Sequence, residues 1–136
     1  MAYIKDKCQD CDRNIPMFVK QHADRSGLVW SLEYCCPYCG CTISLDDRGY
    51  PPEDIREAIL AAEGEWYLAI AETDPGLILI TVSRLRNVLN LSLSEAMQLK
   101  RKIPGEIASG TRAEMERLRI ILDGDAIDTK VERKYC

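Results

Sequence analysis

The residues of this sequence whose types and spacing could do chemistry are its cysteines. Seven cysteines occur in 136 residues, and six of them lie between positions 8 and 41. Four of these form two C-x-x-C pairs, Cys8-Gln9-Asp10-Cys11 and Cys36-Pro37-Tyr38-Cys39. A C-x-x-C turn presents two thiolates on one loop, and two such loops complete a tetrahedral site for one metal ion. The spacing therefore predicts a metal site made of Cys8, Cys11, Cys36 and Cys39.

The segment between the two pairs has room for a β-hairpin, with strands expected at 15–19 and 28–34. With Pro37 and Gly40 shaping the second turn, the first 45 or so residues resemble a zinc ribbon. The resemblance implies a structural zinc ion, because four thiolates leave no open coordination position for catalysis. Cys35 or Cys41 could replace a neighbour as ligand, and six thiols at these spacings could instead hold an iron–sulfur cluster. Cys136 is interpreted as a free terminal thiol without a role.

The charge and composition exclude several classes of function. Lys and Arg number 18 against 22 Asp and Glu, so the net charge is −4 and a nucleic-acid partner is not expected. The sequence has no long apolar run and no secretory leader at its start, which predicts a cytoplasmic protein without a membrane segment. His22 is the only histidine, and no phosphate-binding or nucleophile motif occurs, so we expect no enzyme.

The elements that must position these residues change character near Tyr50-Pro51-Pro52. We predict a metal-binding module at 1–50, a connector helix at 51–64 and an α/β domain at 65–136. In that domain we expect strands at 65–71, 106–108 and 126–132, and a helix at about 76–90. Two capping boxes, Ser92 to Glu95 and Thr111 to Glu114, begin two further helices. The fold class is α+β, with a zinc-ribbon-like module followed by a small sandwich ordered strand-helix-helix-strand-helix-strand.

Residues 65–133 resemble the C-terminal domain of the bacterial large-subunit ribosomal stalk protein, a fold shared with Clp-protease adaptors. The resemblance lies in the strand at 65–71, Arg84-Leu85-Arg86, Leu91-Ser92-Leu93-Ser94-Glu95-Ala96, and the apolar spacing at 118–122. It implies that the first two helices dock translational GTPases, through a surface that includes Arg84, Arg86, Asn90 and Ser94. Family lysines are replaced here by Ser83 and Ser94, and turn glycines by Asn90 and Ser92. The run 100–102 is interpreted as the solvated end of a helix.

These features together indicate a non-enzymatic protein-binding protein. In size, charge and architecture the chain resembles immunity proteins that neutralise bacterial polymorphic toxins of the Rhs type. That resemblance implies a toxin domain as partner, with Asp10, Asp12, Asp46 and Asp47 meeting its basic substrate groove. The alternatives are a translation-associated factor that binds a GTPase or the ribosome, and a zinc-ribbon nucleic-acid binder.

Overall fold

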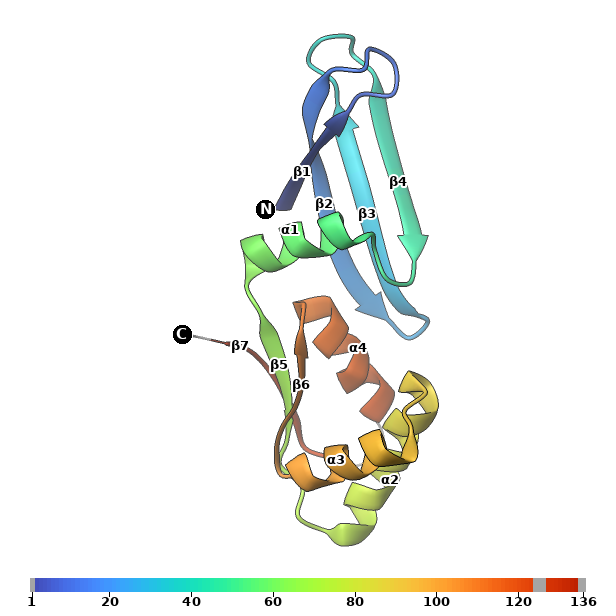
Figure 1. Cartoon of the computed structure of the whole chain (residues 1–136), viewed down its shortest axis with the longest axis vertical. Coiled ribbons are helices and arrows are strands. Elements are labelled where there is room, and N and C mark those ends of the chain that lie inside the picture. Colours follow the sequence, from blue (N-terminus) through green and yellow to red (C-terminus); the bar gives the residue numbers. More distant parts are fainter. Residues whose placement is uncertain (1, 124–126, 135–136) are drawn as a thin grey trace. The chain divides into compact units, whose positions relative to one another are not determined.

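The computed structural model describes residues 2–123 and 127–134. Within these residues the chain forms seven strands and four helices, and it divides into two compact units, Met1–Gly64 and Glu65–Cys136 (Figure 1). Each unit has its own sheet. The division falls at Gly64, which has a φ of 80° and ends the helix before it.

The first unit is built on a four-stranded antiparallel sheet in the order β1-β2-β3-β4. Its strands are β1 (Ala2–Lys7), β2 (Asn14–Asp24), β3 (Gly27–Cys35) and β4 (Thr42–Arg48). Ile15, Met17 and Val19 of β2 are buried while the residues between them are more exposed, which is the alternation expected of a half-covered strand. The expected hairpin strands at 15–19 and 28–34 lie within β2 and β3.

A single helix, α1 (Glu53–Glu63), packs on one face of this sheet. Ile55 and Ile59 are buried against Ala2 of β1 and Val19 of β2, with Trp30 packed beside them. The sequence predicts this helix as a connector at 51–64. In the structure it belongs to the first unit and supplies half of the buried residues in one of that unit's two apolar clusters.

The second unit combines a three-stranded antiparallel sheet, ordered β6-β5-β7, with three helices. Its elements are β5 (Trp66–Ile70), α2 (Pro75–Leu89), α3 (Leu93–Lys102), β6 (Gly105–Gly110), α4 (Arg112–Leu122) and β7 (Thr129–Arg133). Their order confirms the predicted α+β class, a zinc-ribbon-like module followed by an α/β region. The last strand was expected from 126, and that position lies outside the described residues.

Local signals place the helix boundaries of the second unit. The Asp74 carboxylate accepts the N–H of Gly76 at 2.8 Å, and Pro75 occupies the first helical position of α2. Both predicted capping boxes form: Ser92 and Glu95 exchange hydrogen bonds at 3.1 Å, and Thr111 and Glu114 do the same at 2.9 and 3.1 Å. These caps satisfy N–H groups that the first turn of a helix leaves without an internal partner.

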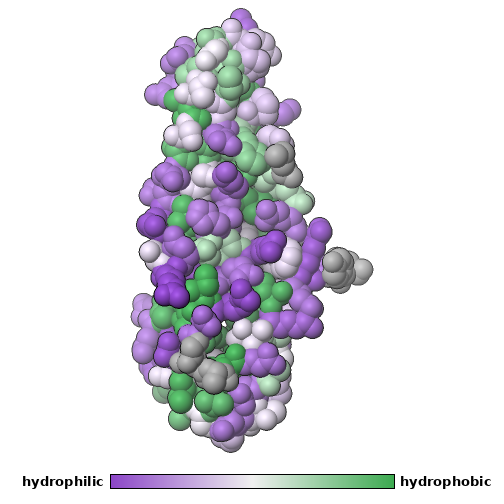
Figure 2. Space-filling view, turned by 180° about the vertical axis from the view of Figure 1, so that it is seen from behind, coloured by the Kyte–Doolittle hydropathy of each residue, from purple (hydrophilic) through white to green (hydrophobic). Residues whose placement is uncertain are grey.

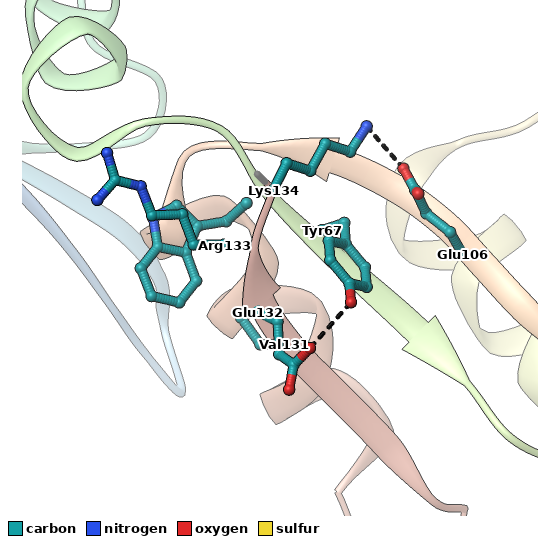
Figure 3. A pocket seen from close by; sticks show the side chains of 7 residues that line it. Tyr67, Glu106, Val131, Glu132, Arg133 and Lys134 are labelled. Carbon is teal, nitrogen blue, oxygen red and sulfur yellow. Dashed lines mark hydrogen bonds and ion pairs between the residues drawn. The ribbon is translucent and has the colours of Figure 1, made fainter. Parts of the chain in front are cut away.

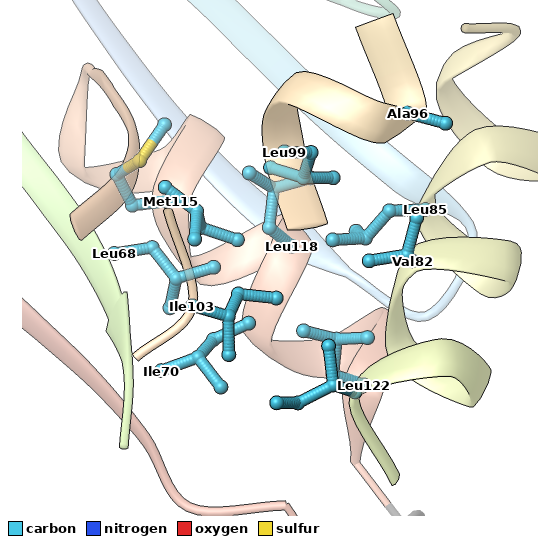
Figure 4. Close-up of a cluster of buried hydrophobic side chains, with 12 residues drawn as sticks. Leu68, Ile70, Val82, Leu85, Ala96, Leu99, Ile103, Met115, Leu118 and Leu122 are labelled. Atoms are coloured by element: carbon cyan, nitrogen blue, oxygen red, sulfur yellow. The ribbon is translucent and has the colours of Figure 1, made fainter. Parts of the chain in front are cut away.

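The core of the second unit lies between its sheet and its helices (Figure 4). Leu68 and Ile70 of β5 meet Leu85 of α2, Leu99 of α3 and Leu118 of α4. Tyr67 and Ala69 alternate with Leu68 and Ile70 and point to the other face of the sheet, which none of α2, α3 and α4 covers. None of the helices in the described part of the chain is both long and apolar enough to cross a membrane.

Candidate metal centre

The two C-x-x-C pairs lie in the two turns at one end of the four-stranded sheet. The first pair lies between β1 and β2, and the second lies between β3 and β4. The sulfur atoms of Cys8, Cys11, Cys36 and Cys39 all lie within 4.8 Å of one another. The structure thus brings together the four cysteines that the spacing singles out, and the group is compatible with a metal site.

The sulfur positions fit a single tetrahedral ion. The Sγ atoms of Cys8 and Cys39 are 3.6 Å apart, and so are those of Cys11 and Cys36. With zinc–sulfur bonds of about 2.3 Å, the edge of a regular tetrahedron of sulfurs is about 3.8 Å. Both close pairs join one turn to the other, so an ion bound here would hold the two turns together.

The two turns have the same hydrogen-bonding pattern, position for position. The N–H of Cys8 donates to the carbonyl of Arg13 at 2.9 Å, and the N–H of Cys36 donates to that of Cys41 at 2.8 Å. The N–H of Asp12 donates to the carbonyl of Cys8 at 2.9 Å, and Gly40 does the same to Cys36 at 3.0 Å. Each position of the first turn therefore corresponds to the position 28 residues later in the second turn, as Cys8 corresponds to Cys36.

The fifth residue of each turn adopts a left-handed backbone conformation. Gly40 has a φ of 77°, which suits a glycine, and Asp12 has a φ of 60°. Aspartate tolerates this region better than most residues because its short side chain can hydrogen-bond locally. Asp12 was expected to contact a partner, and its position in the turn gives it a structural role that the sequence did not indicate.

Backbone N–H groups point at the sulfur atoms in the same equivalent pattern. The sulfur of Cys8 accepts from the N–H groups of Cys11 and Asp10, and that of Cys36 accepts from Cys39 and Tyr38. In Cys8 the hydrogen bond from Cys11 is the largest influence, and it lowers the thiol pKa against the effect of burial. Such donors favour thiolates, which are the form that binds metal.

The thiols differ in how readily they ionise. Burial disfavours the Cys36 thiolate, but hydrogen bonds from Cys39, Tyr38 and Cys11 outweigh it and lower the pKa to about 6. The N–H of Cys41 favours the Cys39 thiolate, yet burial and the neighbouring sulfurs of Cys36 and Cys8 raise its pKa to about 12. Like charges this close oppose full ionisation, and a divalent cation among them would reverse that effect.

Side chains around the cluster join the turns to each other and to the sheet. The guanidinium of Arg13, in the first turn, lies 4.6 Å from the ring centre of Tyr38 in the second. The Tyr34 hydroxyl accepts the N–H of Gln9 at 3.3 Å. Beneath them Ile15 and Met17 pack with Cys8 and Cys36, which are buried, so half of this small cluster consists of ligand candidates.

Cys35 and Cys41 lie outside the sulfur cluster. Cys35 is exposed on β3, and its side chain points to the sheet face opposite that of Tyr34. Cys41 is half-buried, and burial together with the Asp10 carboxylate raises the pKa of its thiol. Cys136, expected to be a free thiol, lies outside the described residues.

The four acidic residues expected to meet a partner do not form one surface. Asp10 and Asp12 lie in the first turn, whereas Asp46 and Asp47 pair with Ser31 and Trp30 further along the sheet. Adjacent residues of a strand point to opposite faces, so Asp46 and Asp47 also diverge.

The residues expected to bind a partner in the second unit contribute to its internal structure. Arg84 donates to the carbonyl of Ile121 in α4 at 3.4 Å, and Arg86 donates to that of Leu91 at 3.3 Å. Asn90 ends α2 in a left-handed conformation with a φ of 55°. Ser94 is exposed in the first turn of α3.

A hollow of about 740 Å³ lies on the uncovered face of the second sheet (Figure 3). The Tyr67 hydroxyl donates to the Glu132 carboxylate at 2.9 Å, and the Lys134 ammonium lies 2.8 Å from the Glu106 carboxylate. The charged residues that line it are two acidic and two basic, Glu106, Glu132, Arg133 and Lys134. They neutralise one another, so this hollow offers no net charge to a ligand. No sequence pattern indicates this hollow beyond the alternation of its strands.

Comparison of the chain with protein-family models, with curated proteins and with solved structures finds no match. The assignment of function therefore depends on the chemistry of the chain's own residues.

Proposed function

We propose that Cys8, Cys11, Cys36 and Cys39 hold one structural zinc ion, and that the chain is a non-catalytic protein-binding module. Four sulfurs within 4.8 Å of one another leave room for one ion, whereas an iron–sulfur cluster also places several irons and sulfides among its thiolates. Purified protein should be colourless and contain one equivalent of zinc. Absorbance near 400 nm would instead indicate an iron–sulfur cluster.

The observation that carries the protein-binding proposal is an exposed apolar and basic surface on α2 and α3, which we term the α2–α3 surface. Of the nine large hydrophobic side chains exposed in the described part of the chain, five belong to these helices: Leu79, Ile80, Val88, Leu93 and Met97. Figure 2 shows hydrophobic side chains on the surface at the lower end of the view, where the second unit lies. Exposed apolar groups that gather in this way are typical of protein-interaction sites.

The charges of the α2–α3 surface are almost all positive. Between residues 75 and 104 the basic residues are Arg84, Arg86, Lys100, Arg101 and Lys102, and the one carboxylate, Glu95, is engaged in the capping box. On α3, Leu93 and Met97 are one turn apart, and Lys100 and Arg101 continue the same stripe. A partner for this surface would combine apolar side chains with carboxylates.

Two classes of partner fit the proposal. The resemblance to the ribosomal stalk domain favours a translational GTPase, because the corresponding helices of that family dock GTPases. The resemblance to immunity proteins favours a cognate toxin domain. The dispersal of Asp10, Asp12, Asp46 and Asp47 makes the α2–α3 surface the better candidate for the contact with either partner.

Binding of the purified chain to two probes tests the proposal: an elongation-factor GTPase, and the product of the reading frame beside the gene, where the cognate toxin of an immunity protein would be encoded. We expect one probe to bind, and the double variant Leu93→Asp, Met97→Asp to weaken that binding at least tenfold. The matched control is Leu45→Asp, since Leu45 is also exposed but lies on β4 of the first unit. Failure of both probes to bind would reject the protein-binding proposal, as would equal losses in the double variant and the control.

A further inference from the structure

The four-stranded sheet has a second face, opposite α1, that no element of its own unit covers among the described residues. The register places side chains on it in rows that cross the strands. One row is Tyr3, Phe18, Glu33 and Ser44, and the next is Lys5, Pro16, Cys35 and Thr42. We call this surface the open face.

Two aromatic rings occupy the β1–β2 half of the open face. The ring centres of Tyr3 and Phe18 are 5.5 Å apart, and Tyr3 is 53% exposed. They line a hollow of about 440 Å³ together with Pro16, Glu33, Thr42 and Ser44. The two rings are inclined at 56° to each other, so each offers its own face to a planar ligand group.

Lysines bracket the aromatic pair on both sides. Lys5 is two residues from Tyr3 along β1, and Lys20 is two residues from Phe18 along β2 in the other direction across the sheet rows. Two residues of a strand span about 7 Å, so one lysine lies on each side of the aromatic pair. The Lys20 ammonium is 5.9 Å from the centre of the Phe18 ring. Lys7 continues the β1 column, and its ammonium lies 3.8 Å from the Asp12 carboxylate in an exposed ion pair that a phosphate can replace. The carboxylates that the register places on the open face lie beyond these residues: Asp24 at the end of β2, which pairs with Arg48 at 3.3 Å, and Glu33 and Asp46 on β3 and β4.

We propose that the open face binds single-stranded nucleic acid, with bases stacked on Tyr3 and Phe18 and phosphates near Lys5, Lys7 and Lys20. Aromatic side chains flanked by cations form the recurring platform for unpaired bases, because every base has a stacking face and every nucleotide a phosphate. The three lysines would repel a basic peptide. An acidic peptide need not carry a planar group, so the two aromatic rings would add nothing to its binding. This activity is separate from the protein binding proposed for the second unit.

Glu33 supplies a means of reading the base. Its residue pairs directly with Phe18 across the sheet, so its carboxylate borders the aromatic pair. A carboxylate accepts a hydrogen bond from the exocyclic amino group of cytosine, and uracil has no such donor. The open face should therefore prefer cytosine to uracil.

The net charge of −4, which disfavours nucleic acid in general, limits the affinity without abolishing the site. Charges further away than about 10 Å are largely screened at 0.1 M salt, so the local lysines dominate contact. We expect dissociation constants in the range of nonspecific binding, about 10⁻⁴ to 10⁻⁶ M.

Fluorescence anisotropy of labelled twelve-nucleotide oligomers with zinc-loaded full-length chain tests the proposal. We expect oligo-C to bind more tightly than oligo-U at 50 mM salt, with RNA and DNA versions identifying the preferred sugar. The logarithm of the binding constant should fall with the logarithm of salt concentration with a slope of about −2, because three phosphate contacts contribute about −0.7 each. Lys20→Gln should reduce the steepness by about 0.7.

Variants of the aromatic and acidic residues complete the test. Tyr3→Leu keeps an apolar side chain without a stacking ring and should weaken binding roughly tenfold, whereas Tyr3→Trp should retain it. Glu33→Gln should reduce the preference for oligo-C. Lys102→Gln, in the second unit, is the matched control and should change nothing. Absence of binding at 50 mM salt, equal effects of Tyr3→Leu and Lys102→Gln, or full competition by a polyglutamate peptide would overturn the proposal.

Discussion

Removal of the proposed zinc ion should unfold the first unit and leave the second unit folded. The first unit has two small apolar clusters, and Cys8 and Cys36 make up half of one of them. The second unit has a single core of twelve buried residues and no cysteine among its described residues. The two units should therefore respond differently to a chelator.

The magnitude follows from the size of the first unit. A domain of the 64 residues from Met1 to Gly64 ordinarily has a free energy of unfolding of about 3 to 10 kcal/mol. Structural zinc contributes about 10 to 16 kcal/mol in small metal-folded domains at neutral pH. Loss of the ion therefore removes as much stability as the unit has, or more. The second unit loses no interaction of its own.

Hydrogen–deuterium exchange read by mass spectrometry, with and without EDTA, measures both units in one experiment. We expect amides of β1 to β4 and α1 to lose protection in the metal-free protein, and those of β5, α2, α3 and α4 to keep it. Cys36→Ser should reproduce the chelator's effect, while Cys35→Ser should not, because Cys35 is exposed outside the sulfur cluster. Protected β1 to β4 amides in protein shown to be metal-free would refute the reasoning.

Three further outcomes are expected. Gly40→Ala should lower the free energy of unfolding by about 1 kcal/mol, because an alanine is strained at a φ of 77° although no neighbouring atom obstructs its Cβ. Asp12→Gly should not lower it. Denaturant midpoints measure both changes, and equal losses in the two variants would contradict the reasoning. Thr111→Ala should cost about 1 to 2 kcal/mol in the second unit by removing a buried cap, and an unchanged melting temperature would count against this. The hydrogen bond from Lys130 lowers the pKa of Glu132. The ion pair of these two residues therefore stabilises the fold above about pH 4.3, and this stabilisation is lost as the pH falls through the lowered pKa. The stability difference between Glu132→Gln and the unaltered chain should shrink between pH 7 and 3, and a constant difference would argue otherwise.

The sequence predicted well those features that depend on short-range spacing. The C-x-x-C pairs placed the candidate metal site, and the two capping boxes placed α3 and α4. Between Leu77 and Val82 the β-branched residues also suit a strand, and the cap at Asp74 followed by Pro75 correctly favoured a helix. In each case the decisive residues lie within a few positions of one another.

The edge strands of the first sheet escaped prediction because apolar alternation in each covers only two positions, Ala2 and Ile4 in β1 and Ile43 and Leu45 in β4. In β4 nearly every residue is exposed, and it ends with Asp46, Asp47 and Arg48. In β1 the run Lys5, Asp6, Lys7 looks like a solvated loop. Both are strands because the turns at their ends bring them beside β2 and β3, which is a long-range effect that no local pattern reports.

The left-handed conformation of Asp12 was hidden for a related reason. Glycine at position 40 signals a positive φ by its type, but an aspartate does not. The two turns have matching hydrogen bonds at Cys8 and Cys36, and only this equivalence shows that position 12 must adopt the same positive φ as position 40. An offset of 28 residues becomes informative once both turns are known to have the same form.

The open face connects the metal site to the proposed binding of nucleic acid. Tyr3 and Phe18 are fifteen positions apart in the sequence. Their rings meet because the register of β1 against β2 pairs these two residues. The turn that sets this register is the one that contains Cys8 and Cys11. If the ion holds that turn, chelation must separate the two rings as well, so affinity for oligo-C should disappear with the zinc while partner binding by the α2–α3 surface persists. A metal-free chain that still preferred oligo-C would show that the register is held by the sheet alone.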